Sequence, residues 1–317
     1  MDVDYLRVSV TDRCNLRCVY CNPPGGHAVM ERGELLSFEE IQRLVRLCAE
    51  CGIRRVRLTG GEPLVREDIA DLVRGLAGIP GIEEVSLTTN GVLLGGMAGR
   101  LREAGLRRVN ISIDSAERRC YERITGSDLL GQVLEGMHQA IEAGLNPVKI
   151  NCVVIREVNL AQVAELARMG MELGVLVRFI EYCPVGKYVG PAGHYVPNSE
   201  VRRIIEARFG RLSSVVAADS QGPAVHFKAR GWAGAIGFIS GRSSIFCHRC
   251  NRLRLRSDGK IKPCLHSARC YDLRRLLRHG ASDQGILEQL RRILREKSRY
   301  TKLSASAGDL SMQNIGG

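Results

Sequence analysis

The sequence has no apolar run of about 18 residues, the length that a membrane-spanning helix requires. Charged residues already occur at positions 2, 4 and 7, so the start lacks the apolar stretch of a secretion signal. Aromatic residues are scarce at 5%, whereas 35 of the 317 residues are glycine. With a hydrophobic content of 44%, this composition favours an α/β protein with aliphatic strands and many tight turns. We therefore expect a cytoplasmic protein with no membrane partner.

Lysine is also scarce, because only seven of the 46 basic residues are Lys although the formal net charge is +12. The excess is arginine, spread along the whole chain, and no basic run is interleaved with aromatic residues. Such a run is typical of nucleic-acid binding, so we expect no nucleic-acid partner. Positive charge of this kind instead favours a small anionic substrate.

Cysteine, in contrast, is abundant, with twelve residues in the chain. A reducing compartment argues against disulfides, so clustered cysteines there indicate metal or catalytic sites. Three clusters occur, at Cys14/Cys18/Cys21, Cys48/Cys51 and Cys247/Cys250/Cys264. We interpret the second cluster as packing, because it lies within a predicted helix with its members one turn apart. Cys120, Cys152 and Cys270 are interpreted as structural.

The first half of the chain alternates short aliphatic runs with longer amphipathic ones, a pattern typical of βα units. The predicted strands cover residues 5–10, 54–59, 83–89, 107–113, 147–154 and 175–181. Between them, "SFEEIQRLVRLCAECG" (37–52) predicts a helix with a capping box from Ser37 and Glu40. Six βα units indicate a parallel sheet with helices outside and a ligand site at the carboxyl ends of the strands.

The regular alternation of predicted strands and helices changes after about residue 195. We therefore divide the chain into a first domain at 1–210 and a second at 211–317. Residues 198–210 predict a helix, and "AVHFKARGWAGAIGFIS" (224–240) predicts a hairpin turning near Gly231 to Gly234. Two Arg-rich helices follow, to about residue 299, before a polar tail that ends in Gly-Gly.

The first cysteine cluster has the spacing C-x-x-x-C-x-x-C and directly follows the first predicted strand. One interpretation is a zinc loop with a distant fourth ligand such as His27. The other is a 4Fe–4S cluster on three thiolates, which leaves one iron free to bind a ligand. Tyr20, inside the loop, is an aromatic residue that can pack on that ligand.

This spacing, with an aromatic residue before the third Cys, resembles the motif of the radical SAM superfamily. "TGGEP" (59–63), after the second strand, resembles the GGEP motif that contacts the amino group of S-adenosyl-L-methionine in that superfamily. The resemblance implies an incomplete (βα)6 TIM-like barrel. It also implies that Cys14, Cys18 and Cys21 hold a 4Fe–4S cluster that cleaves S-adenosyl-L-methionine to a 5′-deoxyadenosyl radical.

The third cysteine cluster lies in "FCHRCNRLRLRSDGKIKPCLH" (246–266). Its residues alone leave open a zinc knuckle completed by His266 or Cys270. On a strand, Arg252 and Arg254 would point the same way, and paired guanidinium groups suit a phosphate. The alternative is a solvent-exposed edge strand whose arginines prevent pairing with other chains.

Nearly end to end, the chain resembles the MoaA family of GTP 3′,8-cyclases of molybdenum cofactor biosynthesis. The resemblance is carried by "LRVSVTDRCNLRCVYC", "RLTGGEP", "LTTNG", "NISIDS", "VKIN", "RFIEY", "FCHRCNRLRL" and the terminal "IGG". It implies a radical SAM lyase with two 4Fe–4S clusters, the second on Cys247, Cys250 and Cys264. The C-terminal domain would cover the barrel mouth.

The resemblance also implies roles for individual residues. The cofactor-binding residues would be Tyr20, Gly61, Glu62, Ser112 and Cys183, where the family has Met at the last position. The GTP-binding residues would be Arg7, Arg57, Thr88, Lys149, Arg178, Arg252, Leu253 and Arg254. Arg252 and Arg254 would be catalytic together with the first three cysteines, and the tail Gly316 and Gly317 would reach the active site.

In the implied reaction, the radical removes hydrogen from the ribose 3′ carbon of GTP, and that carbon attacks carbon 8 of guanine. The product would be (8S)-3′,8-cyclo-7,8-dihydroguanosine 5′-triphosphate. Implied partners are an external electron donor, a downstream cyclic pyranopterin monophosphate synthase and a possible second copy of the chain. The alternative is a radical SAM peptide-maturation or RNA-modifying enzyme with an auxiliary cluster.

Overall fold

A single mixed sheet organises the computed structural model, which describes residues 3–22, 29–183, 194–216, 222–244, 246–247, 250–265, 267 and 269–297. Six parallel strands pair in chain order from β1 to β6. These strands and the helices between them are β1 (Tyr5–Ser9), α1 (Phe38–Glu50), β2 (Arg55–Thr59), α2 (Ile69–Ala77), β3 (Glu84–Thr89), α3 (Ala98–Glu103), β4 (Leu106–Ser112), α4 (Arg118–Thr125), α5 (Leu130–Glu142), β5 (Val148–Val154), α6 (Val163–Glu172) and β6 (Leu176–Glu181). Short 3-10 turns η1 (Arg32–Glu34), η2 (Pro63–Val65) and η3 (Leu160–Gln162) lie between them. All six predicted strands are confirmed.

The second half of the chain extends this sheet at both ends. Its elements are α7 (Asn198–Phe209), β7 (Ser213–Val215), β8 (Val225–Lys228), β9 (Ala235–Ile239), β10 (Arg252–Leu255), β11 (Lys260–Lys262), β12 (Tyr271–Asp272), α8 (Leu273–Arg278) and α9 (Asp283–Lys297). β9 pairs parallel with β6, and β10 pairs parallel with β1, so eight neighbouring strands run in parallel. The predicted hairpin is confirmed as β8 and β9.

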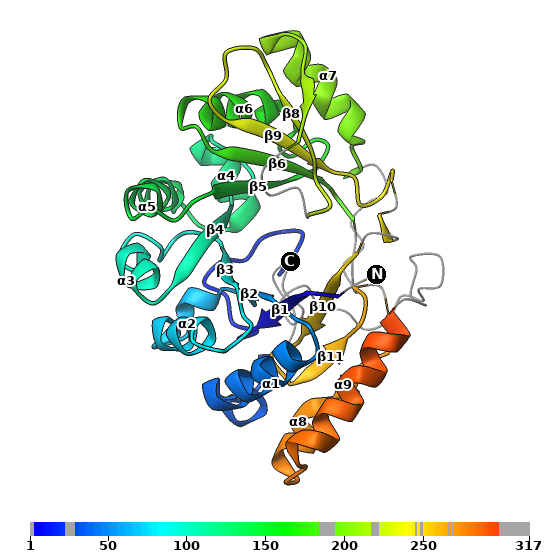
Figure 1. The fold of residues 1–317 in the computed structure, drawn as a ribbon. Coiled ribbons are helices and arrows are strands. Elements are labelled where there is room, and N and C mark those ends of the chain that lie inside the picture. The colour runs from blue at the N-terminus through cyan, green and yellow to red at the C-terminus, as the bar shows by residue number, and fades with distance from the viewer. Residues whose placement is uncertain are drawn as a thin grey trace.

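The sheet curves, and helices α1 to α6 lie along the outside of the curve (Figure 1). Alternate strand residues such as Leu6, Val8, Val56 and Leu58 are fully buried in the hydrophobic core of the protein. Because strand side chains alternate between the two faces, the intervening residues Arg7 and Arg57 point to the opposite, inner face. The curve thus separates an apolar outer layer from a polar interior.

Helix α1 shows how local sequence sets these elements. Ser37 accepts a hydrogen bond from the Glu40 backbone at 3.1 Å, and Glu40 accepts one from the Ser37 backbone at 2.8 Å. This capping box begins the helix, and Cys48 lies 2% exposed in the core on its inner side. Cys51 ends the helix, so the packing interpretation of this C-x-x-C pair is confirmed. Among the described residues, none of the helices combines the length and apolarity needed to cross a bilayer.

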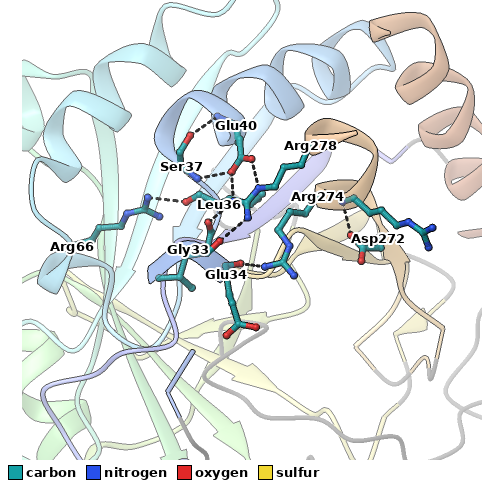
Figure 2. Close-up of polar contacts among 11 residues, drawn as sticks. Gly33, Glu34, Leu36, Ser37, Glu40, Arg66, Asp272, Arg274 and Arg278 are labelled. Atoms are coloured by element: carbon teal, nitrogen blue, oxygen red, sulfur yellow. Dashed lines mark hydrogen bonds and ion pairs between the residues drawn. The ribbon is translucent and has the colours of Figure 1, made fainter. Parts of the chain in front are cut away.

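Helix α8 docks against the segment before α1 through arginine side chains (Figure 2). Arg278 donates to both carboxylate oxygens of Glu40, at 2.7 and 3.0 Å, and to the carbonyl oxygens of Gly33 and Leu35, at 2.6 and 3.0 Å. Arg274 donates to the carbonyl oxygen of Glu34. The two halves of the chain are therefore joined by directional contacts as well as by the sheet.

Replacing Arg278 with Ala should lower the free energy of unfolding by about 1–2 kcal/mol, because four partly exposed hydrogen bonds are lost together. Urea unfolding followed by circular dichroism measures this change. Arg275→Ala, an exposed position on the same helix, is the matched control and should stay within about 0.5 kcal/mol of the parent. Equal losses in the two variants would show that the docking contacts add no stability.

Candidate active site

The first three cysteines lie on one loop at the carboxyl end of β1. The backbone N–H groups of Cys21 and Asn22 both donate to the Cys18 carbonyl, at 3.0 and 2.8 Å, which folds the loop into a tight turn. Cys14 Sγ accepts from the Leu16 N–H at 3.4 Å and from the Asn90 side chain at 3.8 Å. The structure therefore places the three cysteines that the spacing singled out on one loop, close enough for their charges to interact.

Burial and mutual repulsion oppose ionisation of these thiols when no cation is bound. Burial raises the pKa of Cys18 well above its ordinary value, and the charges of Asp114, Cys21 and Cys14 raise it further. Burial also raises the pKa of Cys21 to about 12. The positive charge of bound iron would stabilise the thiolate form of these side chains. Three neighbouring thiols fit a 4Fe–4S cluster. Within the described residues, no three His, Cys, Asp or Glu side chains group closely enough for a single metal ion.

The "TGGEP" turn after β2 packs directly on this cysteine loop. Gly61 donates its N–H to the Thr11 carbonyl at 2.8 Å, and Glu62 donates its N–H to the Arg13 carbonyl at 2.7 Å. A Cβ atom on Gly61 would lie 2.3 Å from the Arg13 carbonyl oxygen, so only glycine permits this approach. The second motif is thus placed against the first by backbone contact.

Glu62 joins this turn to β3. Its carboxylate accepts from the Thr89 hydroxyl at 2.7 Å and from the backbone N–H groups of Leu64 and Asn90, at 2.9 and 2.6 Å. Burial raises the pKa of this carboxyl to about 7, against the effect of those hydrogen bonds. Glu62 therefore holds the ends of two strands together at the edge that carries the cysteine loop.

Tyr20 is fixed from the side of β4. Its hydroxyl donates to Asp114 at 2.5 Å, and the other Asp114 oxygen accepts from the Val153 N–H at 2.7 Å. Burial raises the pKa of Asp114 to about 6. Ser112, at the end of β4, is half-buried and pairs in register with Asn151. Carboxylates thus lie close to the first cysteine set.

The polar interior of the curve forms a cavity of about 120 Å³. Its lining includes six of the predicted GTP-binding residues, namely Arg7, Arg57, Thr88, Lys149, Arg178 and Arg252. It also includes residues to which the sequence analysis assigned no role: Tyr5, Arg108, Asn110, Asn151, Ile180, Gly222, Pro223, Ala224, His226, Ile239 and Asn251. Arg108 and Asn110 could have been found from strand alternation, since they share a face with Ser112.

Positive charge is concentrated in this cavity. Burial and, after it, the charge of Arg57 lower the pKa of Arg178 to about 9. Burial likewise lowers the pKa of Lys149 to about 6, with Arg178 and Arg108 adding to the effect. The Arg178 Nε atom is buried and has no hydrogen-bond partner in the part of the chain that the structure describes. A bound anion would relieve both the desolvation and the repulsion.

The second cysteine set consists of Cys247 and Cys250, which precede β10, and Cys264, which follows β11. The Cys250 N–H donates to the Cys247 carbonyl at 3.1 Å, and the Cys250 Sγ accepts from Lys297 Nζ at 3.5 Å. Burial opposes ionisation of Cys250, yet Arg252 and Lys297 bring its pKa down to about 7. Burial and the charge of Arg252 lower the pKa of Arg254 to about 10, and Cys250 and Cys264 lie close enough to oppose that effect. Three thiols in a basic setting also suit an iron–sulfur cluster.

The remaining predicted residues differ in their placement. Leu253 is 1% exposed within the hydrophobic core, so its side chain faces away from the cavity that Arg252 lines. Cys183 is half-buried, two residues beyond β6. Cys270 is half-buried near Lys262, where burial lowers the lysine pKa and the charge of Cys270 opposes that effect. His27, His266, Gly316 and Gly317 lie outside the described residues.

Two family models match the chain. The radical SAM superfamily matches residues 8–170, and Molybdenum Cofactor Synthesis C matches residues 175–303. A GTP 3′,8-cyclase of Pelotomaculum thermopropionicum is 44% identical over 318 residues, covering 100% of this chain and 98% of the relative. A GTP 3′,8-cyclase of Moorella thermoacetica is 45% identical and covers 89% of this chain and 87% of the relative.

Solved structures are similar in fold at lower identity. Streptococcus suis SuiB has a TM-score of 0.60 at 16% identity, covering 91% of this chain and 64% of its own. The structure of anSMEcpe with bound AdoMet has a TM-score of 0.52 at 18% identity, covering 65% of this chain and 60% of its own. These likenesses support the radical SAM type of barrel.

Proposed function

Because the chain belongs to the radical SAM family of GTP 3′,8-cyclases, we propose that it converts GTP to (8S)-3′,8-cyclo-7,8-dihydroguanosine 5′-triphosphate, the first step of molybdenum cofactor biosynthesis. The observation that carries this proposal is one cavity lined by six basic side chains, Arg7, Arg57, Arg108, Lys149, Arg178 and Arg252, from six different strands. A triphosphate is the ligand whose charge suits such a lining.

The radical SAM type of enzyme uses one 4Fe–4S cluster and S-adenosyl-L-methionine, which together supply a 5′-deoxyadenosyl radical when bound. In our proposal Cys14, Cys18 and Cys21 hold that cluster. Gly61 and Glu62 place the turn that meets the methionine moiety, and Tyr20 supplies a ring held by Asp114. Ser112 and Cys183 complete the set of residues that contact the cofactor.

The cations of the cavity would bind the nucleotide and orient its ribose. Arg57 is set by its neighbour Ser86, whose hydroxyl accepts from Nε at 3.2 Å. The Thr88 side chain is held in place by Asn110, whose amide donates to the threonine hydroxyl at 3.3 Å. Fixed side chains of this kind hold a substrate in one pose, which is the main task when the cofactor supplies the radical.

The finer parts of the proposal concern the second half of the chain. Cys247, Cys250 and Cys264 would hold a second 4Fe–4S cluster, beside which Arg252, Leu253 and Arg254 present their strand to GTP. Residues 1–210 and 211–317 would form the two domains, and Gly316 and Gly317 would reach the site. An external electron donor, a downstream synthase that accepts the product and a possible homodimer are the proposed partners.

The test is release of 5′-deoxyadenosine. The protein is reconstituted anaerobically with iron and sulfide, reduced with dithionite and given S-adenosyl-L-methionine with GTP, with ATP or with no nucleotide. We expect release that depends on GTP, together with a cyclised triphosphate detected by mass spectrometry. Release that is indifferent to the nucleotide would refute GTP as the substrate and redirect attention to peptide or RNA substrates.

A further inference from the structure

Lys297 is a buried lysine at the end of a helix. It is the last described residue of α9, and its side chain is buried at 5% exposure. Burying an ammonium is costly unless an anion or a strong acceptor lies beside it. Within the described residues, that acceptor is the Cys250 sulfur, 3.5 Å from Nζ. The chain has only seven lysines among 46 basic residues, and one of them contacts a cysteine of the second set.

The fold holds this contact from both ends of α9. At the start of the helix, Asp283 accepts from Arg43 at 2.8 Å and from Arg46 at 2.5 Å, which ties the helix to α1. Near its end, Glu296 accepts from the Tyr271 hydroxyl. A helix of 15 residues spans about 22 Å, so α9 carries Lys297 from the outside of the sheet to the cysteine set. Buried Ile286, Leu290 and Ile293 pack its inner side.

The two cysteine sets differ in the charges around them. Carboxylates of Glu62 and Asp114 act on the first set, whereas Arg252, Arg254 and Lys297 act on the second. Adding one electron to a cluster makes it one unit more negative. Cations nearby favour that reduced state, and hydrogen bonds to the cluster sulfurs act in the same direction.

We propose that Lys297 is a positioning residue of the second cysteine set, and that its ammonium, donating to Cys250 Sγ, raises the reduction potential of the cluster bound there. This inference rests on the second cluster of the proposed function. Lysine suits the task because its compact charge approaches a single sulfur, whereas the planar fork of arginine is shaped for two oxygens. The second cluster is then the easier of the two to reduce by one electron.

The test uses the full chain carrying Cys14→Ala, Cys18→Ala and Cys21→Ala, so that iron bound after reconstitution reports the second set alone. Dithionite supplies the electron, and electron paramagnetic resonance follows the reduced cluster across a potential titration. We expect Lys297→Met to lower the one-electron equilibrium constant roughly tenfold, which is a shift of about 59 mV. Lys297→Arg keeps the charge and should recover part of the shift.

Arg292→Met is the matched control, because it removes one charge from an exposed position on the same helix. It should leave the potential unchanged. An unchanged potential in Lys297→Met, with iron retained, would overturn the inference while leaving the second cluster in place. Loss of iron in Lys297→Met alone would also overturn it, since the ammonium would then be needed to build the site. Absence of iron from every variant would overturn the second cluster itself, and the inference with it.

Discussion

A chain carrying Cys14→Ala should release no 5′-deoxyadenosine above background, with or without GTP. Cys14 supplies one of three thiols on the loop after β1, and a cluster cannot be held there by Cys18 and Cys21 alone. With the proposed second cluster in place, its bound iron should fall by about half, because the substitution leaves Cys247, Cys250 and Cys264 untouched. Iron and sulfide analysis alongside product chromatography measures both effects.

Cys48→Ala is the control for this experiment. Cys48 belongs to a cysteine pair outside both sets, and it is buried in the core on the inner side of α1. This variant should keep its iron and its 5′-deoxyadenosine release, at the modest cost in stability of a trimmed core residue. Normal release from Cys14→Ala would contradict the placement of the radical-generating cluster on this loop.

Replacing Arg178 with Met should weaken GTP binding about 10- to 100-fold, the effect expected when one charge-assisted contact of about 1.5–3 kcal/mol is lost. Arg178 lines the cavity and its Nε has no partner among the described residues, so this atom can donate to an anion. Equilibrium binding of GTP, measured anaerobically, follows the change. Uncoupled cleavage of S-adenosyl-L-methionine without GTP should be unaffected.

The same substitution should leave the free protein as stable as before, or more so. Burial and the neighbouring Arg57 disfavour the charge on Arg178, and Met fills a similar volume without it. Arg156→Met is the control, because Arg156 pairs with Glu200 at 3.0 and 2.7 Å, away from the cavity lining. If both variants bound GTP equally well, the cavity would not be the triphosphate site.

Much of this architecture could be predicted from the sequence. The six strands were visible because Val, Ile and Leu alternate with polar residues in short runs closed by Gly, Asp or Asn. The cysteine loop and the "TGGEP" turn were predicted at the same edge of the sheet, because both follow parallel strands. The structure adds the reason that they touch, namely the absence of a Cβ atom on Gly61.

Other features left no local pattern. Pairing of β10 with β1 joins residues at opposite ends of the chain, and nothing within "RLRL" specifies that partner. Arg108 was missed because it lies two residues before the "NISIDS" motif on which the resemblance rests, although Glu84 fixes its guanidinium at 2.7 Å in the cavity wall. Lys297 was missed because a lysine near the end of an amphipathic helix is typical of a solvated surface.

The pairing of β1 with β10, a strand from the second half of the chain, affects how the protein folds during synthesis. Arg7 in β1 pairs with Arg254 in β10, so the first strand to leave the ribosome waits for nearly the whole chain to be synthesised. At 5–20 residues per second that interval is roughly 12 to 50 s, during which one edge of β1 has no native neighbour. An open strand edge of this kind readily pairs with other chains. Synthesis of the second half therefore acts as the step that protects the first half from misassembly, and slow translation after residue 210 should favour aggregation.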